Sequence, residues 1–294
     1  MPTIKLKTPA KINLILSILK KRLDNYHEVE TIYQTISLFD VITVEYRESS
    51  ELNIRIKSNS NEMPLDSSNL AYKAAHRFLE AIHQKADVKI NITKNIPIAA
   101  GLAGGSSDAA CVLNALNKIN FYPLKEDIIK RIAQSLGADI SFFLKSGSAI
   151  GKGIGDILQP IKTPNLDIVL VKPKNVAISS KWAYEKYDEL SIKPAPKRIF
   201  DLLEGIEENN IEKLSENLFN SLEYVVFKEH HQLKVYKERL INLGCYNALL
   251  SGSGSAIFAI AKNEEHAREV EDKIKSEALD TWVVKTISVS SSIS

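Results

Sequence analysis

Hydrophobic and polar positions in the first third of the chain recur mostly with a period of two. Residues 4–7 alternate apolar side chains with lysine, and later stretches are rich in branched apolar residues, which is typical of strands that cover a core. The predicted strands are 4–7, 12–19, 29–38, 41–46 and 52–56. The pattern of 29–38 also allows a helix, but its Thr and Ile content favours a strand.

The hydrophobic period changes near residue 70. An apolar residue recurs at every fourth position over 70–82, which places one apolar stripe on a helix. Alternation returns in 88–92, so a strand is expected to lead into the glycine-rich stretch 97–110. The first half is completed by a helix after that stretch, a helix near 127–136 that ends at Gly137, and a glycine-punctuated segment, 147–156.

The second half mixes short strands with helices and begins with a Val-rich strand at 168–171. A proline-rich linker is expected at 193–196. The predicted helices are one capped by Ser179-Ser180, then 197–203, 211–218, 231–243 and 265–277; the remaining predicted strands are 248–250, 257–261 and 281–289. The pattern therefore predicts an α+β protein of two domains, residues 1–158 and 159–294.

Composition limits the classes of function. Among 294 residues, the net charge is only +2 and no long basic run occurs, which argues against a nucleic-acid or membrane-surface partner. The two cysteines, Cys111 and Cys245, have no metal-type spacing, so a disulfide framework is not expected and a reducing compartment fits. No apolar run is long enough to span a bilayer and no signal-type segment opens the chain. A cytoplasmic location is the expectation.

The stretch 97–110 reads P-I-A-A-G-L-A-G-G-S-S-D-A-A. Glycines permit close backbone approach to a ligand, and the helix that follows offers unpaired N–H groups to an anion. The stretch matches neither G-x-x-x-x-G-K-[ST] nor G-x-G-x-x-G, so a purely structural turn is the alternative. Asp108 suits the helix dipole but would repel a phosphate. Either a cation or an outward-pointing side chain would resolve that conflict.

Two charged residues lie in apolar surroundings. Lys11 interrupts an apolar strand, and the plain interpretation is a solvent-facing lysine. Asp139, in L-G-A-D-I-S-F-F, is either a helix cap or the acceptor of a hydroxyl proton. In the second case a nearby Lys11 would keep the aspartate ionised. Sequence spacing does not place the two together. Tyr26-His27 follows the turn predicted at Asp24-Asn25, where a ligand contact is more plausible than for the other histidines.

Taken together, these motifs resemble the GHMP kinase superfamily of small-molecule kinases, over nearly the whole chain. The matching segments are P-A-K-I-N-L at 9–14, D-N-Y-H at 24–27, the glycine-rich stretch 97–110, L-G-A-D at 136–139 and S-G-S-G-S at 251–255. The first two segments are similar to the branch that phosphorylates the 2-hydroxyl of 4-diphosphocytidyl-2-C-methyl-D-erythritol with ATP. The alternatives are a homoserine, mevalonate or sugar kinase of the superfamily, or a non-catalytic nucleotide-binding member.

The resemblance implies a role for each motif. Asp139 would be the catalytic base and Lys11 its partner, with ATP and Mg²⁺ as cofactors. The cytidine diphosphate substrate would meet Asn13, Tyr26, His27 and, stacked on the cytosine, Tyr184. The ATP cradle would comprise Pro97, Ile98, Ala99, Ala100, Gly101, Leu102, Ala103, Gly104, Gly105, Ser106 and Ser107, and the third glycine motif Gly252, Ser253 and Gly254. Ser106, Ser107 or Asp108 would lie near Mg²⁺.

The resemblance also implies an architecture, a ribosomal-S5-domain-2-like domain followed by a ferredoxin-like domain with the site in the cleft between them. The protein would act as a monomer or weak homodimer. Three residues depart from the family pattern. Ala177 replaces a serine, so a hydrogen bond from that position is not expected. Asn25 replaces a glycine, and asparagine is the next best residue at positive φ. Ala103 replaces a common loop glycine, so φ there is expected to be compatible with a Cβ.

Overall fold

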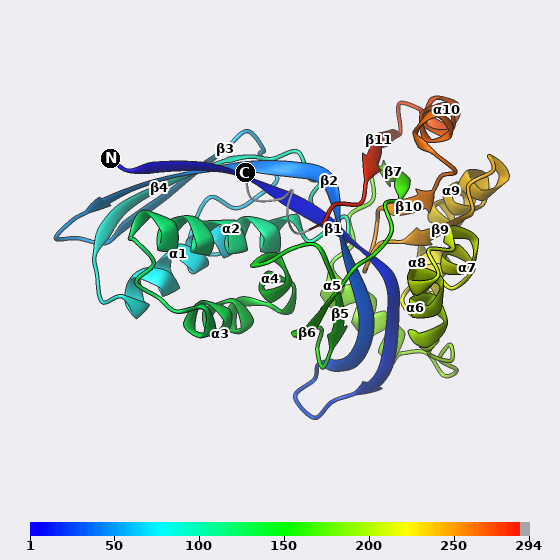
Figure 1. The fold of residues 1–294 in the computed structure, drawn as a ribbon, viewed down its shortest axis with the longest axis horizontal. Helices are drawn as coiled ribbons and strands as arrows, with labels where there is room; N and C mark the ends of the chain where they lie inside the picture. Colours follow the sequence, from blue (N-terminus) through cyan, green and yellow to red (C-terminus); the bar gives the residue numbers. More distant parts are fainter. Residues whose placement is uncertain (289–294) are drawn as a thin grey trace.

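The computed structural model describes residues 1–288, which form two β-sheets with helices packed on each (Figure 1). The larger sheet has seven strands, in the order β3-β4-β2-β1-β8, with β5 paired to β2 and β6 paired to β5. Its strands are β1 (Thr3–Lys21), β2 (His27–Glu48), β3 (Asn53–Ser58), β4 (Ala86–Thr93), β5 (Ser148–Lys152), β6 (Ile157–Ile161) and β8 (Phe219–Asn220). This sheet carries most of the first half of the chain.

Strands β1 and β2 form one long antiparallel hairpin. The segments predicted as separate strands at 4–7 and 12–19 belong to β1, and those at 29–38 and 41–46 belong to β2. The helix alternative for 29–38 is therefore wrong. Pro9 does not end β1, because the pairing shifts register between Pro9 and Ala10, and a bulge tolerates a residue that lacks an N–H. Asn25, in the connecting turn, has φ 65°, as expected.

Four helices cover one face of the larger sheet (Figure 1). Apolar residues of α1, α2 and α3 pack on β4 and β2 in one buried cluster that includes Phe78 and Leu116. Asn69 caps α1 through its side chain, which accepts a hydrogen bond from the Ala71 N–H. The helices are α1 (Leu70–Ala81), α2 (Gly104–Ile119), α3 (Glu126–Leu136) and the short α4 (Ala138–Phe143), which sequence analysis missed.

The smaller sheet is antiparallel in the order β11-β7-β10-β9. With α10 between β10 and β11, this is the strand order of a ferredoxin-like domain, as expected. Its strands are β7 (Asp167–Pro173), β9 (Asn247–Leu250), β10 (Ile257–Ile260) and β11 (Leu279–Lys285). Its helices are α5 (Ser180–Asp188), α6 (Phe200–Glu207), α7 (Ile211–Glu216), α8 (Glu223–Glu229), α9 (His231–Asn242) and α10 (Glu264–Ile274). Helix α8 was not predicted, and the end of the predicted strand at Val289 lies outside the described residues.

The two halves of the chain share structure at their junction. Strand β6 crosses the boundary expected after residue 158 and pairs with β5. Strand β8, from the second half, pairs with β1. One buried apolar cluster joins Ile12 and Ile36 to Leu170 and Phe258. The boundary itself stays a prediction, but this shared core holds the two sheets in a defined relation at the place where the motifs converge.

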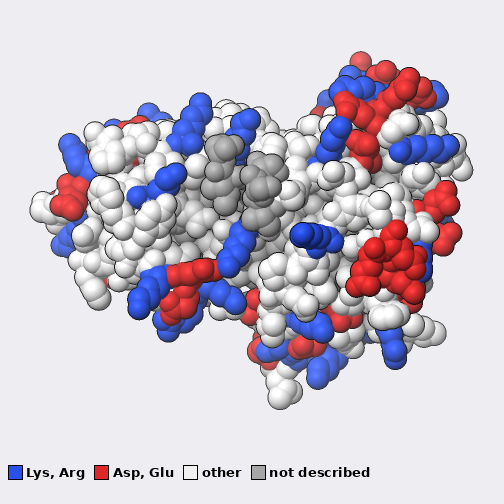
Figure 2. Space-filling model, viewed as in Figure 1, with Lys and Arg blue, Asp and Glu red and all other residues white. Residues whose placement is uncertain are grey.

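Charged residues are dispersed over the face shown in Figure 2, where Lys and Arg side chains alternate with Asp and Glu and a small acidic group lies over α6 and α7. Within residues 1–288, no helix is both long and apolar enough to cross a membrane.

Candidate active site

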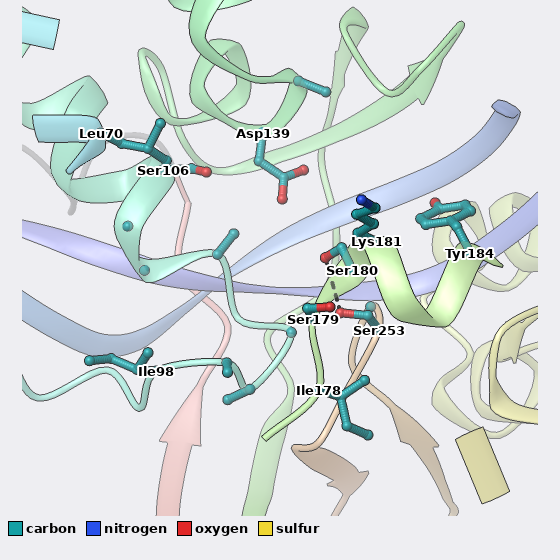
Figure 3. Close-up of a pocket in the computed structure, with 18 of the residues that line it drawn as sticks. Leu70, Ile98, Ser106, Asp139, Ile178, Ser179, Ser180, Lys181, Tyr184 and Ser253 are labelled. Atoms are coloured by element: carbon teal, nitrogen blue, oxygen red, sulfur yellow. Dashed lines mark hydrogen bonds between the residues drawn. The ribbon is translucent and has the colours of Figure 1, made fainter. Parts of the chain in front are cut away.

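A cavity of about 1050 Å³ lies where the two halves meet (Figure 3). Its lining combines β1, the turn before β2, the glycine-rich loop, the start of α4 and α5. Most of the predicted site residues line it: Lys11, Asn13, Tyr26, His27, Pro97, Ile98, Ala99, Ala100, Gly101, Ala103, Gly104, Gly105, Ser106, Asp139, Tyr184, Gly252 and Ser253. The fold therefore gathers five separate sequence motifs around one space.

Three predicted site residues do not line the cavity. The Leu102 side chain is buried in the apolar cluster beneath the loop. Ser107 is fully buried, and its hydroxyl donates to the carbonyl of Pro9 at 2.6 Å, so it is not available to Mg²⁺. The Gly254 N–H donates to the Ser251 carbonyl at 2.8 Å. These residues hold the loops in shape, because their polar groups and side chains are satisfied within the protein.

The glycine-rich loop has left-handed backbone at alternate residues. Ala99, Gly101 and Ala103 have φ of 50°, 75° and 54°. A Cβ on Gly101 would lie 1.9 Å from the Ser251 carbonyl oxygen, so glycine is required there. Ala103 lies in the left-handed region, which an L-residue can adopt although it is unfavourable by about 1–2 kcal/mol. Helix α2 begins directly after it.

The third glycine motif supports this loop from the second half of the chain. The Ser251 hydroxyl donates to the Gly101 carbonyl at 3.1 Å, and the Ala256 N–H donates to the Ala100 carbonyl at 3.1 Å. Gly104, Gly105 and Ser106 then line the cavity at the start of α2. Because the first N–H groups of a helix have no acceptor within it, this end of the cavity can receive an anion.

Lys11 and Asp139 form an ion pair in the lining of the cavity. The Lys11 side chain is only 6% exposed, and its Nζ lies 3.8 Å from Asp139 Oδ2. The same Nζ donates to Asn13 Oδ1 at 2.7 Å. Burial lowers the pKa of Lys11, and the charge of Asp139 opposes that change. The interpretation of Lys11 as a solvent-facing residue is therefore wrong.

Asp139 lies in the first turn of α4, whose N-cap residue is Gly137. Its side chain is not the cap and remains 31% exposed toward the cavity. Tyr33, which sequence analysis missed, also faces this site: burial, together with the charge of Asp139, raises the pKa of the Tyr33 phenol. Tyr33 pairs with Asn13 across the hairpin. Its place in β2, opposite a motif residue, was the available signal.

A second buried charge cluster lies beside the glycine-rich loop. Lys94 Nζ donates to Asp40 Oδ2 at 2.5 Å and to Asp108 Oδ2 at 2.8 Å. All three side chains are at most 6% exposed. The cation that reconciles Asp108 with an anion site is therefore Lys94. Sequence analysis missed both Lys94 and Asp40, although Asp40 interrupts an apolar run.

The two carboxylates of this cluster have unequal surroundings. Asp40 also accepts hydrogen bonds from the N–H groups of Asn95 and Ile96, at 2.6 and 2.8 Å. Asp108 Oδ1 is buried without a hydrogen-bond partner within the described residues. Burial raises the pKa of Asp108 to about 7, with Lys94 opposing and Asp40 adding to the shift. The carboxylates raise the pKa of Lys94, although its burial acts in the opposite direction.

The oxygen atoms suited to Mg²⁺ lie on two helices. Ser106 on α2 and Asp139 on α4 direct side-chain oxygens into the same opening (Figure 3), and Mg²⁺ prefers such oxygen ligands. Asp108 fits less well, because its Oδ2 already accepts a hydrogen bond from the Lys94 ammonium and its Oδ1 is buried. Of the three residues expected near Mg²⁺, only Ser106 fits.

The far end of the cavity is aromatic. Tyr26 is 59% exposed, whereas His27 is buried. His27 Nε2 lies 2.8 Å from Asp188 Oδ1, and the His27 ring stacks on Tyr184 with centroids 4.8 Å apart. One face of Tyr184 is thus covered by a protein side chain. A base could stack on its other face only.

Comparisons with known proteins agree with this geometry. Residues 69–147 match the GHMP kinases N terminal domain and residues 202–280 the GHMP kinases C terminal domain. A 4-diphosphocytidyl-2-C-methyl-D-erythritol kinase of Caldicellulosiruptor bescii is 40% identical over 92% of this chain and 94% of that protein. One of Clostridium perfringens is 38% identical over 97% of this chain and 98% of that protein.

Solved structures are also similar to this chain. The crystal structure of a 4-(cytidine 5'-diphospho)-2C-methyl-D-erythritol kinase has a TM-score of 0.79 and 32% identity, covering 96% of this chain and 99% of that one. A homoserine kinase from Cytophaga hutchinsonii shares the fold, with a TM-score of 0.74 at 18% identity over 98% of this chain and 95% of that one. The chain therefore belongs to the GHMP kinase superfamily and, within it, to the family of the 4-diphosphocytidyl-2-C-methyl-D-erythritol kinases.

Proposed function

We propose that this protein uses ATP to phosphorylate the 2-hydroxyl of 4-diphosphocytidyl-2-C-methyl-D-erythritol, giving the 2-phosphate and ADP. The observation that carries the proposal is the buried Lys11, whose Nζ lies 3.8 Å from Asp139 inside a cavity bounded by the glycine-rich loop. Phosphoryl transfer requires mainly positioning and neutralisation of charge. A lysine–carboxylate pair beside an anion site meets both needs.

Asp139 accepts the proton of the attacking hydroxyl, because its partly exposed carboxylate reaches the cavity. Lys11 keeps that carboxylate ionised and, with its own Nζ held by Asn13, directs the hydroxyl. The ATP phosphates bind at the start of α2, where Gly104 and Gly105 admit close approach. Ser106 would be a ligand of Mg²⁺, which would neutralise charge on the transferred phosphoryl group.

The cytidine end of the substrate binds at the aromatic end of the cavity. Tyr26 stacks on the base, His27 contacts its edge, and Tyr184 supports the His27 ring by stacking on it. Each stacking contact between a base and an aromatic ring contributes about 1–3 kcal/mol. Asn13 is fixed by its hydrogen bond to Thr31 at 2.8 Å, which suits it to hold the methylerythritol hydroxyls near Asp139.

The test is ADP release by wild type with the cytidine substrate, mevalonate or homoserine, each with ATP. We expect turnover with the cytidine substrate and inhibition by free CDP or CMP. Asp139→Asn should lower kcat by about 10³-fold while the affinity for both substrates is kept, and Asp127→Asn, at a carboxylate 68% exposed on α3, should leave kcat unchanged. Near wild-type turnover of Asp139→Asn would show that Asp139 is not the base.

A further inference from the structure

His27 is held by one face of α5. Tyr184, Tyr187 and Asp188 are spaced i, i+3 and i+4, so they lie on the same side of the helix. The Tyr184 ring stacks on His27, the Tyr187 ring meets it edge-on at 6.5 Å, and Asp188 Oδ1 lies 2.8 Å from His27 Nε2. Helix α5 comes from the second half of the chain and His27 from the first. The imidazole is therefore immobilised across the junction.

Asp188 is surrounded by positive charge. Lys21 Nζ donates to its Oδ2 at 2.6 Å, and Lys193 Nζ lies 3.9 Å from its Oδ1. Burial alone would raise the pKa of Asp188, but the hydrogen bonds from Lys21 and His27 outweigh it and lower that pKa. An ionised carboxylate only accepts hydrogen bonds. The hydrogen between the two groups must therefore be carried by His27 Nε2.

We propose that Asp188 is a positioning residue that fixes the Nε2–H form of His27 and thereby makes the site select cytosine over uracil, an inference that rests on the proposed function. A neutral imidazole with its hydrogen on Nε2 has a lone pair on Nδ1. No hydrogen bond joins Nδ1 to another of residues 1–288. With Tyr184 covering a ring face and Asp188 occupying Nε2, Nδ1 is the polar atom of this ring left for a ligand.

The two pyrimidines differ in what they offer to a lone pair. Cytosine carries an exocyclic amine that donates a hydrogen bond, whereas uracil carries a carbonyl oxygen at the same position. Against His27 Nδ1 the amine is paired, and the carbonyl faces a second acceptor. A site built to pair a polar group discriminates strongly against the analogue that leaves that group unpaired.

The test compares the affinities for CDP and UDP, measured by titration calorimetry on the full chain. Wild type should bind CDP at least about tenfold more tightly than UDP. In Asp188→Ala both forms of the imidazole become available, so the ratio should fall toward one while ATP affinity is unchanged. Glu189→Ala removes the neighbouring carboxylate, which is 61% exposed and paired with Lys186, and should keep the wild-type ratio. Asp188→Asn retains an oxygen acceptor and should restore part of it.

Nitrogen-15 NMR of the histidine rings provides a readout that general loosening of α5 would not mimic. The His27 signals are assigned by their loss in His27→Gln. In wild type we expect the hydrogen on Nε2 and the lone pair on Nδ1, and in Asp188→Ala a mixture of the two forms. A hydrogen on Nδ1 in wild type would overturn the inference.

The kinetic results separate this inference from the proposed function. If wild type does not phosphorylate the cytidine substrate, the proposed function is wrong and the inference falls with it. If wild type does so and Asp188→Ala keeps the CDP-to-UDP ratio, the inference alone is wrong. A change confined to KM for the cytidine substrate, with kcat retained, supports a positioning role at the base.

Discussion

Asp108 should reduce the stability of the ligand-free protein at neutral and higher pH. The buried cluster beside the glycine-rich loop contains two carboxylates and one ammonium. Asp40 accepts hydrogen bonds from Lys94 and from two backbone N–H groups, whereas Asp108 has Lys94 alone and one unpaired oxygen. Of the two carboxylates, Asp108 is therefore the one that binds a proton more readily, because fewer hydrogen-bond donors stabilise its negative charge.

The size of the effect follows from the raised pKa of Asp108. Burial raises that pKa from 3.8 to about 7, a difference of about three units, and each unit corresponds to about 1.4 kcal/mol. Because the folded state holds the proton more tightly than the unfolded state, the free energy of unfolding is highest below pH 4 and falls as pH rises to 7. The loss reaches about 4 kcal/mol above pH 7, of which about 3 kcal/mol falls between pH 5 and pH 8.

Asp108→Asn imitates the protonated carboxyl and removes this titration. We compare the free energy of unfolding of the variant with that of wild type, measured by urea unfolding at pH 5 and at pH 8. The variant's advantage over wild type should be larger at pH 8 than at pH 5, by up to about 3 kcal/mol. Asp127→Asn, at an exposed carboxylate on α3, is the control and should show no such difference. An Asp108→Asn protein that loses stability relative to wild type as the pH rises would refute the reasoning, since Asp108 would then be stabilised as an anion by Lys94.

Three further substitutions test the loop and the base site. Gly101→Ala places a Cβ 1.9 Å from the Ser251 carbonyl oxygen, so the loop must shift and kcat/KM for ATP should fall by about 100-fold. An unchanged kcat/KM would mean that this loop does not position ATP. Ala103→Gly relieves a left-handed alanine at φ 54° and should raise the free energy of unfolding by about 0.5–1 kcal/mol after the entropy of glycine is counted; destabilisation in urea would contradict this. Tyr26→Ala should raise KM for the cytidine substrate by about 5- to 150-fold through lost stacking and leave KM for ATP unchanged; equal losses would indicate misfolding.

Much of the fold was predictable because its elements are strongly periodic. The four-residue apolar spacing of 70–82 predicted α1, and the side-chain cap at Asn69 confirms where that helix begins. The errors have a local cause. The separate strands predicted at 4–7 and 12–19 are one strand, because β1 continues through Pro9 by a register shift. The short α4 was missed because six residues are too few to reveal a helical period.

Contiguous motifs were also the predictable part of the site. The composition of the glycine-rich loop predicted an anion site. In the structure, the left-handed residues of the loop are followed directly by the start of α2. Lys11 and Asp139 are far apart along the chain, and no spacing rule brings them within 3.8 Å. Lys11 lies on β1 and Asp139 on α4, so their proximity is a tertiary fact that only the resemblance anticipated.

Buried charges explain why the remaining site residues escaped prediction. Lys94 looks like a loop lysine, and Asp188 like the acidic end of an exposed helix, until their partners are known. Asp40 lies 54 residues from Lys94 and Asp188 lies 161 residues from His27, so neither pairing leaves a local pattern. A charge remains buried only when it is paired, and a charged residue inside an apolar run is therefore a reason to search for a distant partner. At both ends of the cavity that partner decides the chemistry. Lys94 makes a carboxylate tolerable beside an anion site, and Asp188 determines which nitrogen of His27 a base would meet.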